Sequence, residues 1–120
     1  MKERVNALRA ALREQELDAL IVSEANNRRY LSGFTGSAGV LVITEDEEYL
    51  VTDFRYYEQV AQQAPDWELV QVQRKLNKTL AEHVATLDVQ RVGYESHVIS
   101  VKTYRQWEGT MPDVDLVATS

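Results

Sequence analysis

Two β-rich runs joined by a short acidic turn are the feature that most constrains the fold. Residues 40–44 (VLVIT) and 49–53 (YLVTD) flank the acidic residues 45–48 (EDEE). Two such runs around a short polar connection indicate a β-hairpin. Like charges at this density are too costly to bury, so residues 45–48 are expected to form a solvated turn. The chain must therefore build a sheet with at least one antiparallel pair of strands.

The other segments mostly alternate between strand and helix signals. The apolar run 18–23 (DALIVS) is typical of a strand that is covered on both faces. Helices are expected at residues 3–15, 24–33 and 54–63 and after Asn77 and Ser100, and further strands at 67–72, 91–95 and 114–119. This alternation around one hairpin predicts an α/β fold, a mixed β-sheet of about five to six strands with helices on both faces.

Capping residues define the expected ends of the helices. Gly33 is expected to end the helix over 24–33, because glycine tolerates the left-handed conformation that follows many helices. Asp53, Asn77 and Ser100 each carry a side-chain oxygen that can accept a hydrogen bond from a first helical turn. The side chains of the last helix that are expected to face the core are Val101, Tyr104 and Trp107.

The composition is that of one globular domain and argues against several kinds of partner. The chain has 120 residues, of which 44% are hydrophobic and 27% charged, enough for one domain with a core. Its net charge of −6 does not present the broad positive field that nucleic acid or an anionic membrane needs, so neither is expected as a partner. The absence of cysteine excludes disulfides and thiolate metal sites and fits a reducing cytoplasm. No apolar run approaches the ~20 residues that span a bilayer.

Three of the five glycines lie at intervals of three residues, at Gly33, Gly36 and Gly39. A phosphate-binding fingerprint needs G-x-G-x-x-G between a strand and a helix, because the helix N-terminus supplies the donors. Here the pattern is G-x-x-G-x-x-G, it precedes the strand 40–44, and no lysine accompanies it. The glycines are therefore interpreted as allowing backbone conformations closed to other residues, in a tight connection into the hairpin.

Two side chains are candidates for binding, one in this glycine-rich stretch and one in a second unusual stretch, residues 52–60 (TDFRYYEQV). Phe34 is a large apolar residue within a run of small ones, and an aromatic side chain on a stiff loop is suited to contact a ligand or a partner. Arg55 lies in the first turn of the expected helix 54–63, where its charge opposes the helix dipole. Its fork of donors makes it a candidate for holding a carboxylate, either internal or from a ligand.

No set of residues in the chain forms a recognisable catalytic site. The histidines, His83 and His97, do not belong to a metal-ligand pattern such as H-E-x-x-H and are expected to be ordinary surface residues. The serines lack the G-x-S-x-G elbow of serine hydrolases. The sequence therefore predicts no catalytic residue and no metal ligand within these 120 residues.

Three stretches resemble the N-terminal domain of the creatinase, prolidase and aminopeptidase P family. They are residues 30–44 (YLSGFTGSAGVLVIT), 49–60 (YLVTDFRYYEQV) and 92–100 (VGYESHVIS). Their order and spacing match the family, and the resemblance extends over essentially the whole chain. The loop is similar to that of bacterial Xaa-Pro dipeptidases and aminopeptidases, whereas creatinase itself departs there, so a creatine substrate is disfavoured.

The resemblance implies a two-domain parent enzyme. Residues 1–120 would be its single N-terminal domain, and a C-terminal catalytic domain with the pita-bread fold would follow. In the family, that second domain carries two divalent metal ions, commonly manganese, on two aspartates, a histidine and two glutamates, and a water or hydroxide bridging the metals is the nucleophile. The parent would thus be a cytoplasmic Xaa-Pro metallopeptidase (a hydrolase), while this chain alone is expected to be inactive and to hold no cofactor.

The resemblance also implies what the N-terminal domain contributes. In the family it builds the dimer or tetramer interface and brings a loop to the rim of the neighbouring subunit's active site, where it helps to select short Xaa-Pro peptides. Carried over to this chain, that loop is residues 33–37, and Phe34 is its expected contact. The loop is held by Gly33, Gly36 and Gly39, and the expected pocket edge comprises Phe34, Thr35, Arg55 and Tyr56.

Two other functions are compatible with the sequence. A catalytically inactive relative would serve as a protein-binding module, as the same domain type does in a histone chaperone subunit, and the charge of −6 would suit a basic partner. A free-standing nucleotide-binding domain is a further alternative, weakened by the context of the glycines. The sequence does not separate a dipeptidase from an aminopeptidase that takes longer peptides, and it leaves the metal and the oligomeric state open.

Overall fold

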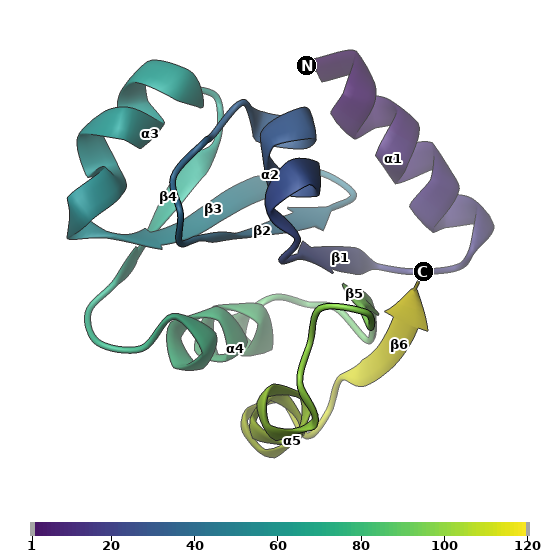
Figure 1. Ribbon diagram of the computed structural model, residues 1–120. Helices are drawn as coiled ribbons and strands as arrows, with labels where there is room; N and C mark the ends of the chain where they lie inside the picture. Colours follow the sequence, from purple (N-terminus) through teal and green to yellow (C-terminus); the bar gives the residue numbers. More distant parts are fainter. Residues whose placement is uncertain (1, 120) are drawn as a thin grey trace.

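The computed structural model describes residues 2–119, whose strands form one six-stranded mixed sheet (Figure 1). The strands are β1 (Ala19–Val22), β2 (Val40–Thr44), β3 (Glu48–Asp53), β4 (Glu68–Val72), β5 (Arg91–Glu95) and β6 (Asp115–Thr119). They lie in the order β4-β3-β2-β1-β5-β6. β2 is antiparallel to both β1 and β3, whereas β3–β4, β1–β5 and β5–β6 are parallel pairs. The expected hairpin is thus confirmed, as strands β2 and β3, and so is the mixed sheet.

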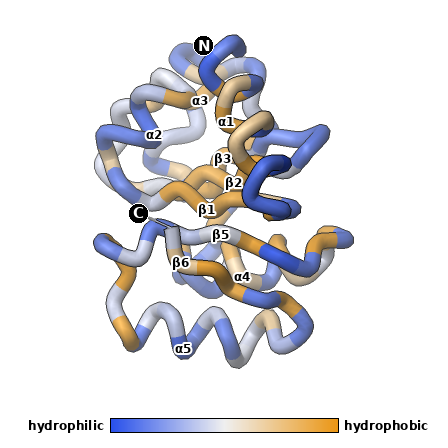
Figure 2. Tube along the Cα trace, turned by 90° about the vertical axis from the view of Figure 1, so that its right-hand side faces the viewer, coloured by the Kyte–Doolittle hydropathy of each residue, from blue (hydrophilic) through white to orange (hydrophobic). Residues whose placement is uncertain are grey.

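Helices cover both faces of the sheet. The helices are α1 (Lys2–Glu14), α2 (Ala25–Ser32), α3 (Tyr57–Gln63), α4 (Leu76–Thr86) and α5 (Val101–Thr110), and a 3₁₀ turn, η1 (Phe54–Tyr56), precedes α3. Figure 1 shows α1, α2 and α3 on one side of the sheet and α4 and α5 on the other. In Figure 2 the apolar strands lie between these two layers. The expected α/β architecture is therefore confirmed.

Strand β1 shows how side-chain alternation divides the core in two. All four of its residues are buried. Leu20 and Val22 pack with residues of α1, α2 and α3, whereas Ala19 and Ile21 pack with residues of α4 and α5. Successive side chains of a strand point to opposite faces, so a continuous apolar run needs cover on both sides. The interpretation of residues 18–23 as a strand covered on both faces is confirmed.

Most of the expected helix ends are confirmed. Gly33 follows the last residue of α2 with φ 83°, in the left-handed conformation. Asp53 caps η1 and Ser100 caps α5, each with a side-chain oxygen that accepts a backbone N–H hydrogen bond. These local signals were readable because an N-cap accepts hydrogen bonds from its own first turn and the C-cap Gly33 donates its N–H to a carbonyl of its own last turn, that of Arg29.

Two expectations about the helices are wrong. α4 begins before Asn77, and the residue at its cap position, Lys75, makes no side-chain capping hydrogen bond. In α5, Trp107 is fully buried as expected, but Val101 is 67% exposed. Periodicity assigns residues to one side of a helix without saying how far along its length that side is covered.

Replacing the cap residue of α5 will test this difference between the two helices. Ser100→Ala should lower the free energy of unfolding by about 1 kcal/mol, because the first turn loses an acceptor. Asn77→Ala is the matched control and should change it by less than about 0.5 kcal/mol. Urea unfolding followed by circular dichroism measures both. A larger loss for Asn77→Ala than for Ser100→Ala would contradict the assignment of the caps.

Candidate functional site

The glycine loop (residues 33–39) is wrapped around the ring of Phe34. A Cβ atom added at Gly36 would lie 2.2 Å from Phe34 Cζ, and one added at Gly39 would lie 3.1 Å from Phe34 Cε2. These two glycines are therefore required by the close approach of the backbone to the ring. Gly33 is required for a different reason, its positive φ. The need for glycine at these three positions thus has a structural reason, and the stiffness of the turn stays a prediction.

The structure corrects the expectation that Phe34 is presented to a partner. Its side chain is only 1% exposed and belongs to the core between the sheet and α1–α3. The ring packs edge-on against that of Tyr56, with the ring centroids 5.7 Å apart. A loop of small residues offers little other apolar area to bury, so its one large side chain turns inward. The Phe34 ring therefore packs between the loop backbone and the core.

Hydrogen bonds to α2 fix the start of the glycine loop. The Ser32 hydroxyl donates to the Arg28 carbonyl at 2.6 Å and accepts the Phe34 N–H at 3.1 Å. The buried Arg28 guanidinium donates to the carbonyls of Ser23 (2.6 Å) and Gly36 (3.2 Å). Burial lowers the pKa of Arg28 below its ordinary value, and the carboxylates of Glu24 and Glu95 oppose that change. The guanidinium thus satisfies carbonyls that would otherwise be buried without donors.

Arg55 holds an internal carboxylate, that of Asp53. Asp53 Oδ1 accepts the backbone N–H of Arg55 at 3.0 Å and its Nε–H at 2.9 Å, and Oδ2 accepts from Nη2 at 2.8 Å. These side-chain hydrogen bonds lower the pKa of Asp53 and raise that of Arg55. The guanidinium also lies 5.1 Å from the centre of the Tyr56 ring. The Arg55 fork is therefore already engaged, and its first role is to brace the turn.

The structure brings the glycine loop and the turn before α3 together at the surface. The Ser37 and Tyr56 hydroxyls are hydrogen-bonded to each other. Thr35 donates its N–H to Gln63 Oε1 at 3.0 Å and accepts from Gln59 Nε2 at 3.0 Å. Of the expected pocket-edge residues, Thr35 and Arg55 are exposed, and Tyr56 is half-buried. The exposed and half-buried residues of these two connected segments are named the loop–turn surface (Thr35, Ser37, Phe54, Arg55 and Tyr56).

Phe54 is the exposed aromatic residue of this surface, and the sequence analysis did not single it out. Its side chain is 77% exposed. The signal that could have found it is the spacing of Tyr56, Val60 and Ala64, which places every fourth residue against the core. Phe54 lies off that stripe, at the cap end of the segment. Asp53 and Arg55, which are hydrogen-bonded to each other, flank Phe54 in the sequence.

The two histidines lie apart and differ in environment. His97 is exposed after β5, as expected. The expectation for His83 is wrong, because its ring is half-buried against Tyr49, with ring centroids 4.4 Å apart. Burial lowers the pKa of His83, and the charge of Glu68 opposes this. Within residues 2–119, no group of three or more histidine, aspartate or glutamate side chains could hold a metal ion. None of the helices described over the same range is long and apolar enough to cross a membrane.

The family of the chain follows from its sequence. It matches the Creatinase/Prolidase N-terminal domain over residues 4–120. The chain belongs to this family. It is 32% identical over 114 residues to the uncharacterized peptidase YqhT of Bacillus subtilis, an alignment that covers 95% of this chain and 32% of that protein.

Solved structures share the fold of this creatinase/prolidase N-terminal domain. The N-terminal domain of the cytoplasmic peptidase PepQ from Mycobacterium tuberculosis is similar with a TM-score of 0.91 and 37% identity, over 98% of this chain and 93% of that one. The Xaa-Pro dipeptidase from Bacillus anthracis is similar with a TM-score of 0.92 and 32% identity, over 99% of this chain and 33% of that one. The chain thus spans about a third of the length of the Bacillus subtilis and Bacillus anthracis relatives.

A methyl group at Gly36 will test the packing of the glycine loop on Phe34. Gly36→Ala should lower the free energy of unfolding by about 1–3 kcal/mol, because the added Cβ overlaps a buried ring. Gly109→Ala is the matched control, since a Cβ there meets no atom within 4 Å, and a helical alanine should stabilise by about 0.5–1 kcal/mol. Thermal and urea unfolding measure both. Equal effects would contradict the close approach.

Truncating each phenylalanine in turn will separate the buried ring from the exposed one. Phe34→Ala should cost about 3–5 kcal/mol, because it leaves a cavity in the core. Phe54→Ala should change the free energy of unfolding by less than about 0.5 kcal/mol, because the side chain is exposed. Urea unfolding of the two variants checks this. A Phe34→Ala variant as stable as the parent chain would show that the ring is not a core residue.

Proposed function

We propose that this chain is the non-catalytic N-terminal domain of a metal-dependent Xaa-Pro dipeptidase or aminopeptidase. The observation that carries the proposal is the match of nearly the whole chain to about a third of the Bacillus anthracis Xaa-Pro dipeptidase. The parent protein would place a C-terminal catalytic domain after residue 120. Its reaction would be hydrolysis of the bond before proline in short peptides.

The metal chemistry of such a parent would come from outside this chain. The described residues offer no cluster that fits a divalent metal ion, so the pair of ions, with manganese as the proposed metal, belongs to the C-terminal domain. The isolated chain is accordingly proposed to be inactive. The similar peptidase from Mycobacterium tuberculosis is described as cytoplasmic, and we propose the same location for the parent.

The loop–turn surface is the proposed contribution of this domain to catalysis. In a homodimer or higher oligomer it would form the edge of the neighbouring subunit's substrate pocket, with Thr35, Arg55 and Tyr56 as the residues at that edge. Three properties support this. The glycine loop packs on the buried Phe34 ring, the hydroxyl-bearing Thr35 and Ser37 are exposed, and the surface carries an exposed aromatic side chain, Phe54.

Kinetics of the full-length parent enzyme test this role. Thr35→Ala should raise KM for an Xaa-Pro dipeptide about fivefold with little change in kcat, the effect of losing one hydrogen bond of about 1 kcal/mol. Thr110→Ala, an exposed threonine at the end of α5, is the matched control and should leave KM unchanged.

A mixed oligomer tests whether the surface acts on the neighbouring subunit. Thr35→Ala subunits would be mixed with subunits that lack one metal ligand of the catalytic domain. The only intact active sites then belong to Thr35→Ala subunits, and some of them face an unmodified loop–turn surface. Partial return of KM to the original value is expected. A KM that does not recover would place the effect within one subunit, and a parent without metal-dependent hydrolysis would favour the protein-binding module.

A further inference from the structure

The strands β1 and β5 create a topological switch point in the sheet. They are adjacent and parallel, with Ala19 opposite Val92. After β1 the chain enters α2, on the face that also carries α1, whereas after β5 it enters α5, on the opposite face. In open α/β sheets, ligands bind in the crevice that such a divergence opens outside the carboxyl ends of the strands.

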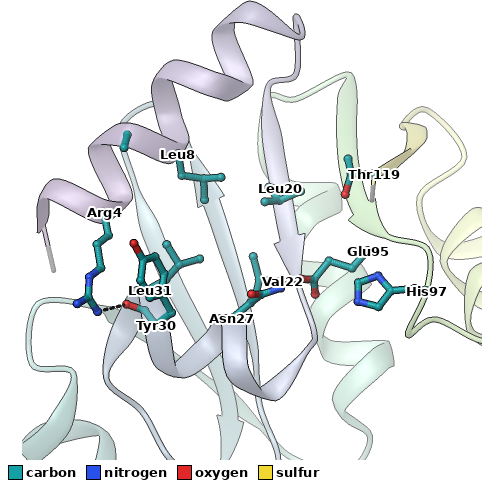
Figure 3. A pocket seen from close by; sticks show the side chains of 11 residues that line it. Arg4, Leu8, Leu20, Val22, Asn27, Tyr30, Leu31, Glu95, His97 and Thr119 are labelled. Atoms are coloured by element: carbon teal, nitrogen blue, oxygen red, sulfur yellow. Dashed lines mark hydrogen bonds between the residues drawn. The ribbon is translucent and has the colours of Figure 1, made fainter.

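A pocket of about 450 Å³ lies at this point, between α1, α2 and the ends of β1 and β5 (Figure 3). Its size falls within the ordinary range of small-molecule sites. Its apolar wall is made by Leu8, Leu20, Val22 and Leu31. Figure 3 shows Asn27, Glu95 and His97 at one end of the pocket and Arg4 and Tyr30 at the other. The pocket is thus apolar along its length and polar at its ends.

Glu95 is the buried charge of the pocket, with a side chain that is only 7% exposed. Its Oε1 accepts the backbone N–H groups of Ser23 at 2.6 Å and Glu24 at 2.8 Å, and its Oε2 accepts from Asn27 Nδ2 at 2.6 Å. A carboxylate has about four acceptor positions. The hydrogen bonds to described residues fill three of them and leave one on Oε2.

The hydrogen bonding at the switch point selects against an anion. Sites for phosphate in α/β proteins offer free backbone N–H groups at the start of the helix after the strand. Here those groups are engaged by carboxylates: the Ser23 and Glu24 N–H groups by Glu95, and the Asn27 N–H by Glu24 Oε2. A negative ligand would meet Glu95 with few donors to stabilise it.

The charges around Glu95 favour a cation. Glu24 and Glu95 are the carboxylates that act on the buried Arg28, so the group carries two negative charges and one positive charge. The Arg28 donors go to backbone carbonyls. Arg4 lies at the far end, 4.3 Å from the centre of the Tyr30 ring and bonded to the Tyr30 carbonyl at 2.9 Å. The end of the pocket at Glu95 is lined by this carboxylate, by the uncharged Asn27 and by the His97 ring. The permanent charge at this end is therefore the negative charge of Glu95, whereas the guanidinium that lines the pocket, that of Arg4, lies at the other end.

We infer that this pocket binds a small amphipathic amine. The protonated amine donates to the remaining acceptor position on Glu95 Oε2, beside Asn27, and the apolar body lies along Leu8, Leu20 and Leu31. The ligand class is thus a primary amine with an aliphatic or aromatic body of a few carbon atoms. The inference does not depend on the proposed peptidase function, because every residue that carries it lies in this chain.

Three matched probes with the same body will test the inference on the 120-residue chain. Hexylamine, hexanol and hexanoate differ in charge at neutral pH, and each contains one unbranched chain of six carbon atoms. Two-dimensional NMR titration should show saturable shifts at the amides of Val22, Asn27 and Glu95 with hexylamine, with a Kd on the order of 1 mM. Hexanol should bind at least about tenfold more weakly, and hexanoate should not bind there.

Each alternative result of this titration would overturn part or all of the inference. Equal binding of hexanol and hexylamine would show a purely apolar pocket without selection for an amine. Tighter binding of hexanoate would show that Arg4, rather than Glu95, determines the ligand charge. Shifts that are absent, or confined to other segments, would show that the pocket binds none of these compounds.

Two variants connect the binding to the named residues. Glu95→Gln should weaken hexylamine binding at least about tenfold and remove the preference over hexanol, because the charge is lost while an acceptor oxygen remains. Glu95 also accepts two backbone N–H groups, so Glu95→Gln can affect folding as well as binding. Leu8→Trp is therefore a second variant, which fills the pocket from a half-buried position on α1. It should abolish binding while the chain stays folded. Val101→Trp, on the exposed start of α5, is the control and should bind normally. Normal hexylamine binding by Leu8→Trp would overturn the inference.

Discussion

The packing of the Phe34 ring against Gly36 and Gly39 is the contact on which the loop–turn surface depends. A Cβ at Gly36 would overlap the ring, so the arrangement requires glycine. The same ring packs edge-on against Tyr56, which joins the loop to the turn before α3. A short loop has few backbone hydrogen bonds of its own, and one buried aromatic ring supplies the packing that gives it a single shape. The exposed residues of both segments therefore rest on a rigid support.

At the junction of β1 and α2, a buried carboxylate holds the backbone in place, as the Phe34 ring does in the glycine loop. A chain that leaves a buried strand carries backbone N–H groups that need partners. Glu95 accepts two of them, from residues more than 70 positions earlier in the chain, and thereby joins the two strands on either side of the switch point. Arg28 does the same for carbonyls of Ser23 and Gly36. The two bonds to Glu95 connect β5 to the β1–α2 junction over a long stretch of chain, whereas those of Arg28 are local and connect α2 to the same junction and to the glycine loop.

The order of the elements and the family were predictable because their signals are local. The hairpin, the strand 18–23 and the caps at Gly33, Asp53 and Ser100 each depend on a few neighbouring residues. The glycine spacing was informative for the same reason. It could be told apart from a phosphate-binding fingerprint because the segment that follows it is a strand and not a helix. The grouping of the candidate residues was predictable in part: Tyr56 contacts both Arg55 and Ser37 of the glycine loop, while the role of these residues at a substrate pocket stays a prediction.

Which aromatic side chain is buried was decided by tertiary structure alone. From the sequence, Phe34 in a loop was expected outside, yet it is buried and Phe54 is exposed. The outcome depends on whether a sheet and a helix leave room beneath the loop, and no local pattern records that. The pocket beside Glu95 was likewise out of reach, whereas an internal carboxylate for Arg55 was one of the two alternatives read from the sequence, and its partner, Asp53, lies two residues away. The sequence determined the elements, their caps and the need for glycine, because these depend on backbone conformation. The three-dimensional packing determined which aromatic ring is buried, the hydrogen-bond partners of Glu95 and the position of the pocket, because these depend on residues brought together from distant parts of the chain.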